Sequence, residues 1–322
     1  MDSKLQVGGP ATATGAWIKD FIDFVETNHI PCDFISTHNY PGDGIGEVFL
    51  GKIMFNAIVG GAKRLHELGG GRTLDGCQAV MTDKTEQAEM AKGQMRIVAK
   101  QVADAVGGKY PIYFSEWNCN AILMSPTNDD KKVAAFQVKT IDEMDDLMAG
   151  SSIWSFSDIL DEFMMIPDDF SGGFGLLTIN GIPKPQFYVL KLLAETGSRK
   201  YDLPYTNDEV EISVYESDTE KRVFVYRQRM KNVAEPDVPY TLELPTAPQD
   251  VMRYSIDKNH CNPKKVWTEM GKPTDMTPTQ IAEIKEKSAL QKEPVSYEMQ
   301  GNTLTISDDI GVNDVHCYII KI

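Results

Sequence analysis

Short apolar runs alternate with amphipathic helical stretches over the first 200 residues, and this alternation constrains the fold more than any other feature. It is typical of β/α units, in which each strand of a parallel sheet is followed by a helix. Four apolar runs are predicted to be strands, at about residues 5–7, 32–38, 110–118 and 152–158. Apolar residues at helical spacing follow them, at about residues 17–25, 86–106, 131–148 and 183–196. We therefore expect four β/α units in this part of the chain.

The character of the sequence changes after about residue 201. Alternating strands are predicted at positions 210–215 and 222–226, as in sheets with one buried face. One helical stretch, at about residues 278–288, interrupts this pattern. The sequence thus predicts two domains, an α/β domain at residues 1–200 and an antiparallel β domain at residues 201–322.

Charge and hydropathy exclude several classes of partner. The chain of 322 residues has 47 acidic and 32 basic residues, which give a formal net charge of -15. This charge repels phosphate backbones and anionic lipids, so we expect neither a nucleic acid nor a membrane as partner. The first residues contain no apolar run of signal-peptide length, and the apolar stretch at 53–60 is too short to span a bilayer. We expect a cytoplasmic protein.

The cysteine, histidine and glycine patterns do not indicate a metal or phosphate site. The five cysteines contain no Cys-x-x-Cys pair, which favours reduced thiols over disulfides or zinc ligands. His66 and Glu67 lack the second histidine of a zinc-protease helix, and the glycine run at 69–71 lacks the Gly-Lys-Ser/Thr ending of a phosphate-binding loop. We expect a chain that needs no metal and no organic cofactor. The cysteines are Cys32, Cys77, Cys119, Cys261 and Cys317.

Polar and aromatic residues gather where three of the predicted strands end. In a β/α barrel the carboxyl ends of the strands face the active site. Carboxylates are the groups that cleave glycosidic bonds, and aromatic rings contact the C–H groups of sugars. The strand ends therefore predict a sugar pocket. Its candidate residues are His38, Tyr40, Glu116, Trp154, Asp158, Asp161 and Glu162.

Two of these candidates have alternative interpretations. A glutamate at a strand end, such as Glu116, commonly forms a salt bridge or caps the following helix. A single histidine in the position of His38 is as often a structural group as a functional one. The residue types alone leave these alternatives open.

Five short motifs occur in a fixed order along the chain, at residues 7–11 (VGGPA), 33–40 (DFISTHNY), 114–118 (FSEWN), 153–158 (IWSFSD) and 170–176 (FSGGFGL). Together they resemble family 39 of the glycoside hydrolases, the β-xylosidase and α-L-iduronidase family. The resemblance implies a (β/α)8 barrel, of the kind called a TIM barrel, followed by an accessory β-sandwich. Residues 182–185 (IPKP) and 257–260 (DKNH) are similar to the β-xylosidase branch. We expect a retaining β-xylosidase of xylan degradation, acting on xylo-oligosaccharides or aryl β-xylosides.

The resemblance also assigns roles to the candidate residues. Glu116 matches the family's catalytic nucleophile. His38 and Tyr40 match active-site residues after the sixth barrel strand. The substrate-contacting segment after the eighth strand is matched by Trp154, Asp161 and Glu162.

The similarity begins at the family's fifth strand, and the chain contains no Asn-Glu dipeptide, the motif that carries the family's acid/base. Four β/α units cannot close a barrel, so we expect half a barrel that is completed in a homodimer or a higher homo-oligomer. The acid/base would then come from the partner chain, as Asp158, Asp161 or Glu162. Two alternatives remain: a separate chain that supplies the other half, or a non-catalytic carbohydrate-binding remnant.

Overall fold

The computed structural model describes residues 4–41, 92–159, 168–204, 206, 208–231 and 234–322. The chain divides into two compact units. The first comprises residues 1–125 and 140–156, and the second residues 126–139 and 157–322. These units differ from the two domains expected from the sequence, and the predicted boundary at residue 200 stays a prediction. Each unit is described by itself.

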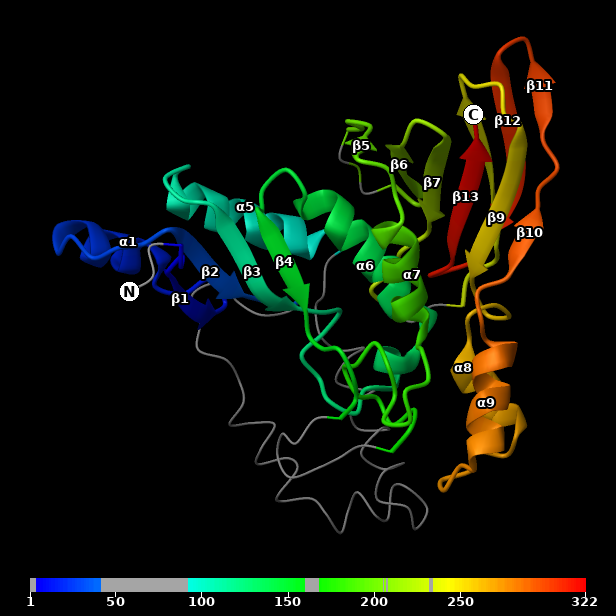
Figure 1. Ribbon diagram of the computed structural model, residues 1–322, viewed down its shortest axis with the longest axis horizontal. Coiled ribbons are helices and arrows are strands. Elements are labelled where there is room, and N and C mark those ends of the chain that lie inside the picture. Colours follow the sequence, from blue (N-terminus) through cyan, green and yellow to red (C-terminus); the bar gives the residue numbers. More distant parts are fainter. Residues whose placement is uncertain (1–3, 42–91, 160–167, 205, 207, 232–233) are drawn as a thin grey trace. The chain divides into compact units, whose positions relative to one another are not determined.

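The first unit contains a four-stranded parallel sheet with the order β1-β2-β3-β4 (Figure 1). A parallel sheet of four strands agrees with the predicted β/α units. Its strands are β1 (Gly8–Ala13), β2 (Phe34–His38), β3 (Ile112–Trp117) and β4 (Gly150–Ile153). The helices that follow are α1 (Ile18–Thr27), α5 (Gln94–Val106) and α6 (Lys131–Met144), which runs on from the second unit.

The first strand, predicted at about residues 5–7, lies later in the chain, and β1 includes Gly8 and Pro10. Strand β1 is at the edge of the sheet, where glycine and proline are tolerated. Glycine is also required at position 8, since a Cβ atom there would lie 2.3 Å from the Phe34 carbonyl oxygen. This close approach brings β1 against β2.

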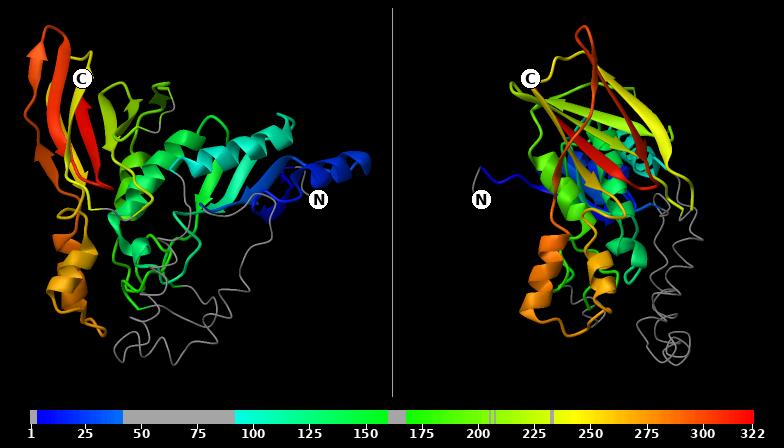
Figure 2. Two further views of the ribbon diagram at one scale, coloured as in Figure 1. Left: turned by 180° about the vertical axis from the view of Figure 1, so that it is seen from behind. Right: turned by 90° about the vertical axis from the view of Figure 1, so that its right-hand side faces the viewer.

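Two antiparallel sheets form most of the second unit, as the alternating pattern after residue 201 predicted (Figure 2). The larger has the order β10-β9-β13-β7-β6-β5 and the smaller β11-β12-β8. The strands are β5 (Arg199–Lys200), β6 (Glu211–Glu216), β7 (Glu220–Tyr226), β8 (Val238–Leu244), β9 (Asp250–Ile256), β10 (Lys292–Pro294), β11 (Glu298–Gln300), β12 (Thr303–Ile310) and β13 (Val315–Lys321).

The larger sheet is buried on both faces. One face shares an apolar core with the smaller sheet. This core includes Val223 and Ile320 from the larger sheet and Leu304 from the smaller one. The other face of the larger sheet packs against residues of α6 and of α7 (Pro185–Ala194). The unit is therefore a two-sheet β structure with helices on its outer face. Between β9 and β10 the chain forms two helices, α8 (Pro263–Glu269) and α9 (Pro278–Lys287). Helix α9 is close to the helix predicted at residues 278–288, whereas α8 was not predicted.

Buried polar groups join the two sheets around His316 on β13, which is 4% exposed. The His316 Nδ1 atom lies 2.9 Å from the Tyr240 hydroxyl on β8, and the Tyr318 hydroxyl donates to Asp308 at 2.7 Å. Burial, reinforced by the nearby Arg253 guanidinium, lowers the pKa of His316 to about 4. The imidazole is therefore neutral in the folded protein at pH 7.

We expect His316 to make the protein less stable as the pH falls from about 6.5 to about 4. In this window the unfolded chain binds a proton on the imidazole and the folded protein does not, so stability rises with pH there and is constant above it. The difference between the pKa of His316 in the unfolded chain and in the folded protein corresponds to about 3 kcal/mol in the free energy of unfolding. Urea denaturation at pH 7 and pH 4 measures the loss, which should be smaller in His316→Gln. An equal loss in both proteins would contradict the assignment.

None of the helices in the described ranges is long and apolar enough to cross a membrane. The four cysteines that the structure describes are free thiols, and three of them are buried. The fifth, Cys77, lies outside the described residues.

Candidate active site

Glu116 and His38 lie side by side at the carboxyl ends of two neighbouring strands. The register of β2 and β3 pairs His38 with Glu116 after an irregularity that follows Thr37. The His38 Nε2 atom is 3.2 Å from Glu116 Oε1, and the two side chains are 24% and 23% exposed. They are thus shielded but reachable from solvent. The structure brings these two predicted residues together.

Hydrogen bonds from both neighbouring strands fix the end of β2. The Thr37 hydroxyl donates to the carbonyl of Thr12 at 2.6 Å and accepts from the amide of Gly15. The Ser115 hydroxyl donates to the Thr37 carbonyl at 3.0 Å, and the amide of Thr14 donates to the His38 carbonyl at 2.8 Å. The backbone that carries His38 is therefore held on each side.

Trp154 is joined to the end of β3. Its amide donates to the Trp117 carbonyl at 2.9 Å, and its carbonyl accepts a hydrogen bond from the Asn118 side chain. The side-chain oxygen of Asn118, Oδ1, also accepts a hydrogen bond from the backbone amide of Cys119 at 2.7 Å. Asn118, which is 2% exposed, thereby ties half-buried Trp154 to the strand of Glu116. Sequence reasoning gave Asn118 no role, although it follows Glu116 by two positions.

Two further residues follow His38 directly, and both are buried. Tyr40, a predicted substrate contact, is 8% exposed. Asn39 is 0% exposed, and neither polar atom of its amide has a hydrogen-bond partner within the part of the chain that the structure describes. Buried amides are normally hydrogen-bonded, so Asn39 is a further candidate at this strand end. Asn39 was missed as a candidate, although it stands between two predicted site residues.

Asp158 belongs to the second unit, where it lies in a buried ionic cluster. Lys184 Nζ is 2.7 Å from Asp158 Oδ2 and 2.7 Å from Asp129 Oδ1, and all three side chains are 0% exposed. The backbone amides of Gly175 and Gly172 donate to Asp158 and Asp129, respectively. These contacts favour a structural role for Asp158. The remaining candidates for the acid/base, Asp161 and Glu162, lie outside the described residues.

The two carboxylates of this cluster differ in their proton affinity. Burial and the neighbouring Asp129 raise the pKa of Asp158 to about 6, although Lys184 opposes the change. The pKa of Asp129 is held below its ordinary value, because Lys184 and Lys264 together outweigh its burial. No group of three metal-ligating side chains occurs within the described ranges.

Comparison with known proteins shows the family of this chain. Residues 1–68 and 75–304 match the sequence model of glycosyl hydrolases family 39. The chain belongs to this family. A β-xylosidase of Caldicellulosiruptor saccharolyticus is 31% identical over 97% of this chain, and one of Geobacillus stearothermophilus is 24% identical over 85%. These matches cover 58% and 49% of those two proteins, so the chain spans about half the length of its curated relatives.

The fold agrees with that of family 39. A solved β-xylosidase structure of this family from Caulobacter crescentus matches 100% of this chain and 58% of that chain, with a TM-score of 0.67 and 21% identity. The family 39 chain described here therefore has the α/β plus β layout expected from its sequence. At this identity the likeness concerns the fold alone, and the roles of individual residues rest on their own geometry.

Proposed function

We propose that this chain carries the nucleophile half of a retaining β-xylosidase-type active site, with Glu116 as nucleophile. The observation that carries the proposal is the contact between Glu116 and His38 at the carboxyl ends of β2 and β3. A retaining glycosidase needs a carboxylate at such a position to attack the sugar. Membership of family 39 and the β-xylosidases among the relatives support the choice of sugar.

The reaction proceeds in two steps. A Glu116 carboxylate oxygen forms a bond to the anomeric carbon as the bond to the leaving oxygen breaks, and a second carboxylic acid protonates that oxygen. Water, deprotonated by the second carboxylate, then attacks the anomeric carbon and releases Glu116. Two inversions leave the configuration retained.

His38 positions the nucleophile in this mechanism. With a proton on Nε2, the imidazole donates a hydrogen bond to Glu116 Oε1, which holds the carboxylate in one orientation. We expect His38→Ala to lower kcat roughly 10- to 100-fold, since a hydrogen bond to a charged group contributes about 1.5–3 kcal/mol. His38→Gln, which retains an N–H donor, should recover part of the loss. Equal kcat values in all three proteins would contradict this role.

Covalent trapping tests the assignment of the nucleophile. A 2-deoxy-2-fluoro-xylosyl fluoride reacts readily with the nucleophile, and the glycosyl-enzyme that it forms hydrolyses slowly. The expected product is therefore a chain with one sugar attached. Peptide mass spectrometry should place the sugar on Glu116. A label on another carboxylate, or no label in a protein that hydrolyses aryl β-xylosides, would overturn the proposal.

The four-stranded sheet is proposed to be half of an eight-stranded barrel, closed by a second copy of the chain. Strands β1 and β4 end the sheet, and each pairs with one neighbouring strand of it. Near the β1 edge the first unit also exposes large apolar side chains, among them Trp17 (67%) and Phe24 (58%). Open sheet edges and exposed apolar groups favour association.

In such a dimer Asp161 or Glu162 of the partner copy would act as acid/base, whereas the contacts of Asp158 with Lys184 occupy its carboxylate. Light scattering should give twice the mass of the chain. Mixing Glu116→Ala with an Asp161→Asn/Glu162→Gln variant should restore hydrolysis, because hybrid dimers contain one complete site. A monomer that remains active would exclude the shared site.

A non-catalytic carbohydrate-binding protein is the second candidate function, supported by the absence of an Asn-Glu dipeptide from the sequence. Aryl xylosides separate the two functions, since a good leaving group needs little acid assistance. Hydrolysis of p-nitrophenyl β-D-xyloside but not of xylobiose would indicate a nucleophile without its acid. Sugar binding without either reaction would favour the binding protein.

A further inference from the structure

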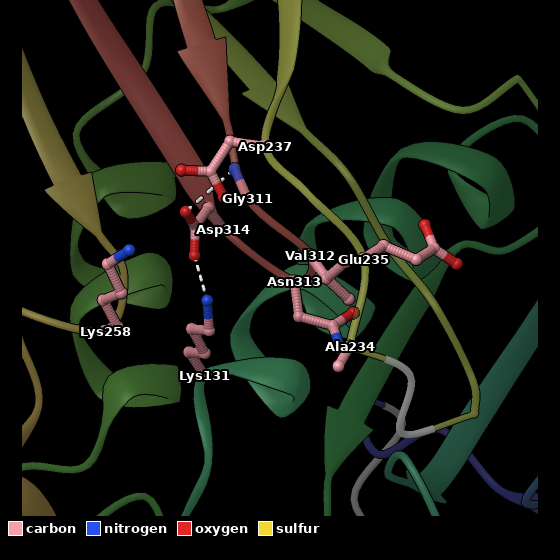
Figure 3. Close-up of a pocket in the computed structure, with 9 residues that line it drawn as sticks. All are labelled: Lys131, Ala234, Glu235, Asp237, Lys258, Gly311, Val312, Asn313 and Asp314. Atoms are coloured by element: carbon pink, nitrogen blue, oxygen red, sulfur yellow. Dashed lines mark hydrogen bonds and ion pairs between the residues drawn. The ribbon is translucent and has the colours of Figure 1, made fainter.

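An open polar groove of about 470 Å³ lies in the second unit, around the turn between β12 and β13 (Figure 3). Four segments form it: the start of α6, residues 234–237 before β8, the loop after β9, and residues 311–314 of the turn. Glu116 and His38 belong to the other unit. The groove is therefore built from residues that the proposed reaction does not use.

The floor of the groove is fixed by hydrogen bonds. Asp314, which is 8% exposed, accepts from the amide of Gly311 at 3.0 Å and forms an ion pair with Lys131. The Asn313 amide donates to the Arg227 carbonyl at 2.7 Å, and the Asn313 side-chain oxygen accepts from the amide of Arg229 at 2.7 Å. A ligand would meet this surface already ordered, which lowers the entropic cost of binding.

Gly311 leaves room for two carboxylates, because it has no side chain. A Cβ atom at this position would lie 2.6 Å from an Asp314 oxygen and 3.0 Å from an Asp237 oxygen. Asp237 and Lys258 are exposed groups of opposite charge on the rim, and neither side chain has a bonded partner among the residues that the structure places. Glu235, in contrast, is held by Arg227 at 2.6 Å.

The polar groups left for a ligand are the Asp237 carboxylate, the Lys258 ammonium and the side-chain nitrogen of Asn313. Val312 and Ala234 add apolar surface. The opposite charges of Asp237 and Lys258 favour neither a simple anion nor a simple cation. Neighbouring hydroxyl groups of a sugar each donate and accept hydrogen bonds, so they match this mixture. We propose that the groove binds a short neutral oligosaccharide at a site separate from the catalytic one. The sugar class, a xylo-oligosaccharide, rests on the proposed function.

Binding should be weak, because the residues that line the groove include no aromatic ring on which a sugar could stack. NMR titration suits such affinities. Xylotriose is added to ¹⁵N-labelled Glu116→Gln protein, which cannot form the glycosyl-enzyme, and the amides of Gly311, Val312 and Asn313 are followed. We expect saturable shifts of these signals.

The double variant Asp237→Ala/Lys258→Ala should abolish the shifts in the groove and leave any shifts near His38 unchanged. The matched control, Asp218→Ala/Lys191→Ala, removes one exposed charge of each sign elsewhere in the same unit and should bind as before. Absent shifts, or unchanged shifts in the double variant, would overturn the proposal. Glycine or sodium sulfate shifting the same amides as strongly as xylotriose would overturn the sugar class.

Hydrolysis of p-nitrophenyl β-D-xyloside by the unaltered chain is measured separately. Activity without xylotriose shifts in the groove would refute this inference alone. Shifts in the groove of an inactive protein would refute the proposed catalysis alone.

Discussion

Glu116→Ala is expected to lower kcat for p-nitrophenyl β-D-xyloside by about 10,000-fold or more, because the variant lacks the carboxylate that we propose as the nucleophile. Azide distinguishes this loss from unfolding. The small anion enters the space that the side chain has left and displaces the nitrophenolate from the same face as Glu116. The expected product is α-xylosyl azide, which NMR identifies.

The matched control is Glu298→Ala, which removes an exposed glutamate on β11 and should retain full activity. Two outcomes would contradict the role of Glu116. One is a variant that keeps more than about a tenth of the activity, which corresponds to a loss of less than about 1.4 kcal/mol in transition-state stabilisation. The other is β-xylosyl azide as product, which would indicate that Glu116 is the acid/base and another group the nucleophile.

Lys184→Met is expected to lower the free energy of unfolding by about 3–5 kcal/mol, the usual cost of removing one partner from a buried ion pair. The variant leaves Asp158 fully buried without the cation that lies 2.7 Å away. Asp129 keeps the amide of Gly172 and a more distant lysine, Lys264, at 3.4 Å. Urea denaturation at pH 7 measures the change.

The control for Lys184 lies on the following helix. Lys191→Met changes an exposed lysine of α7 and should alter stability by less than about 0.5 kcal/mol. Adding Asp158→Asn to Lys184→Met should recover part of the loss, because the second change removes the unpaired charge. A loss below about 1 kcal/mol for Lys184→Met alone would show that the cluster does not stabilise the fold.

Local patterns were sufficient to predict most of the elements that the structure describes. Apolar spacing predicted the helix α6 to its first residue, and alternation after residue 201 predicted the antiparallel strands. The strand-end position of Glu116 and His38 predicted that they would meet, because parallel strands end at a common edge. The half-barrel and its completion by a second copy stay predictions.

Long-range pairing could not be predicted in the same way. Lys184 stands in a motif that was noted, but its partner Asp158 lies 26 positions away and no local spacing connects them. Helix α8 was missed because it is short, with seven residues, and its signals are the Asn262 side-chain cap and Pro263 at its start. No local pattern could predict that the Asn39 amide is buried without a hydrogen-bond partner among the residues that the structure describes.

The division of the chain has a consequence for experiments on truncated proteins. The second unit takes residues 126–139 from the middle of the sequence, so neither unit is one continuous segment. A fragment starting at residue 201 would retain all strands of the larger sheet except β5, but it would lose α7 and α6, which supply residues to the core on one of its faces. Phe224, Ile256 and Ile319 would then be exposed to water. Such a fragment should aggregate, whereas one that begins at residue 126 keeps its covering helices.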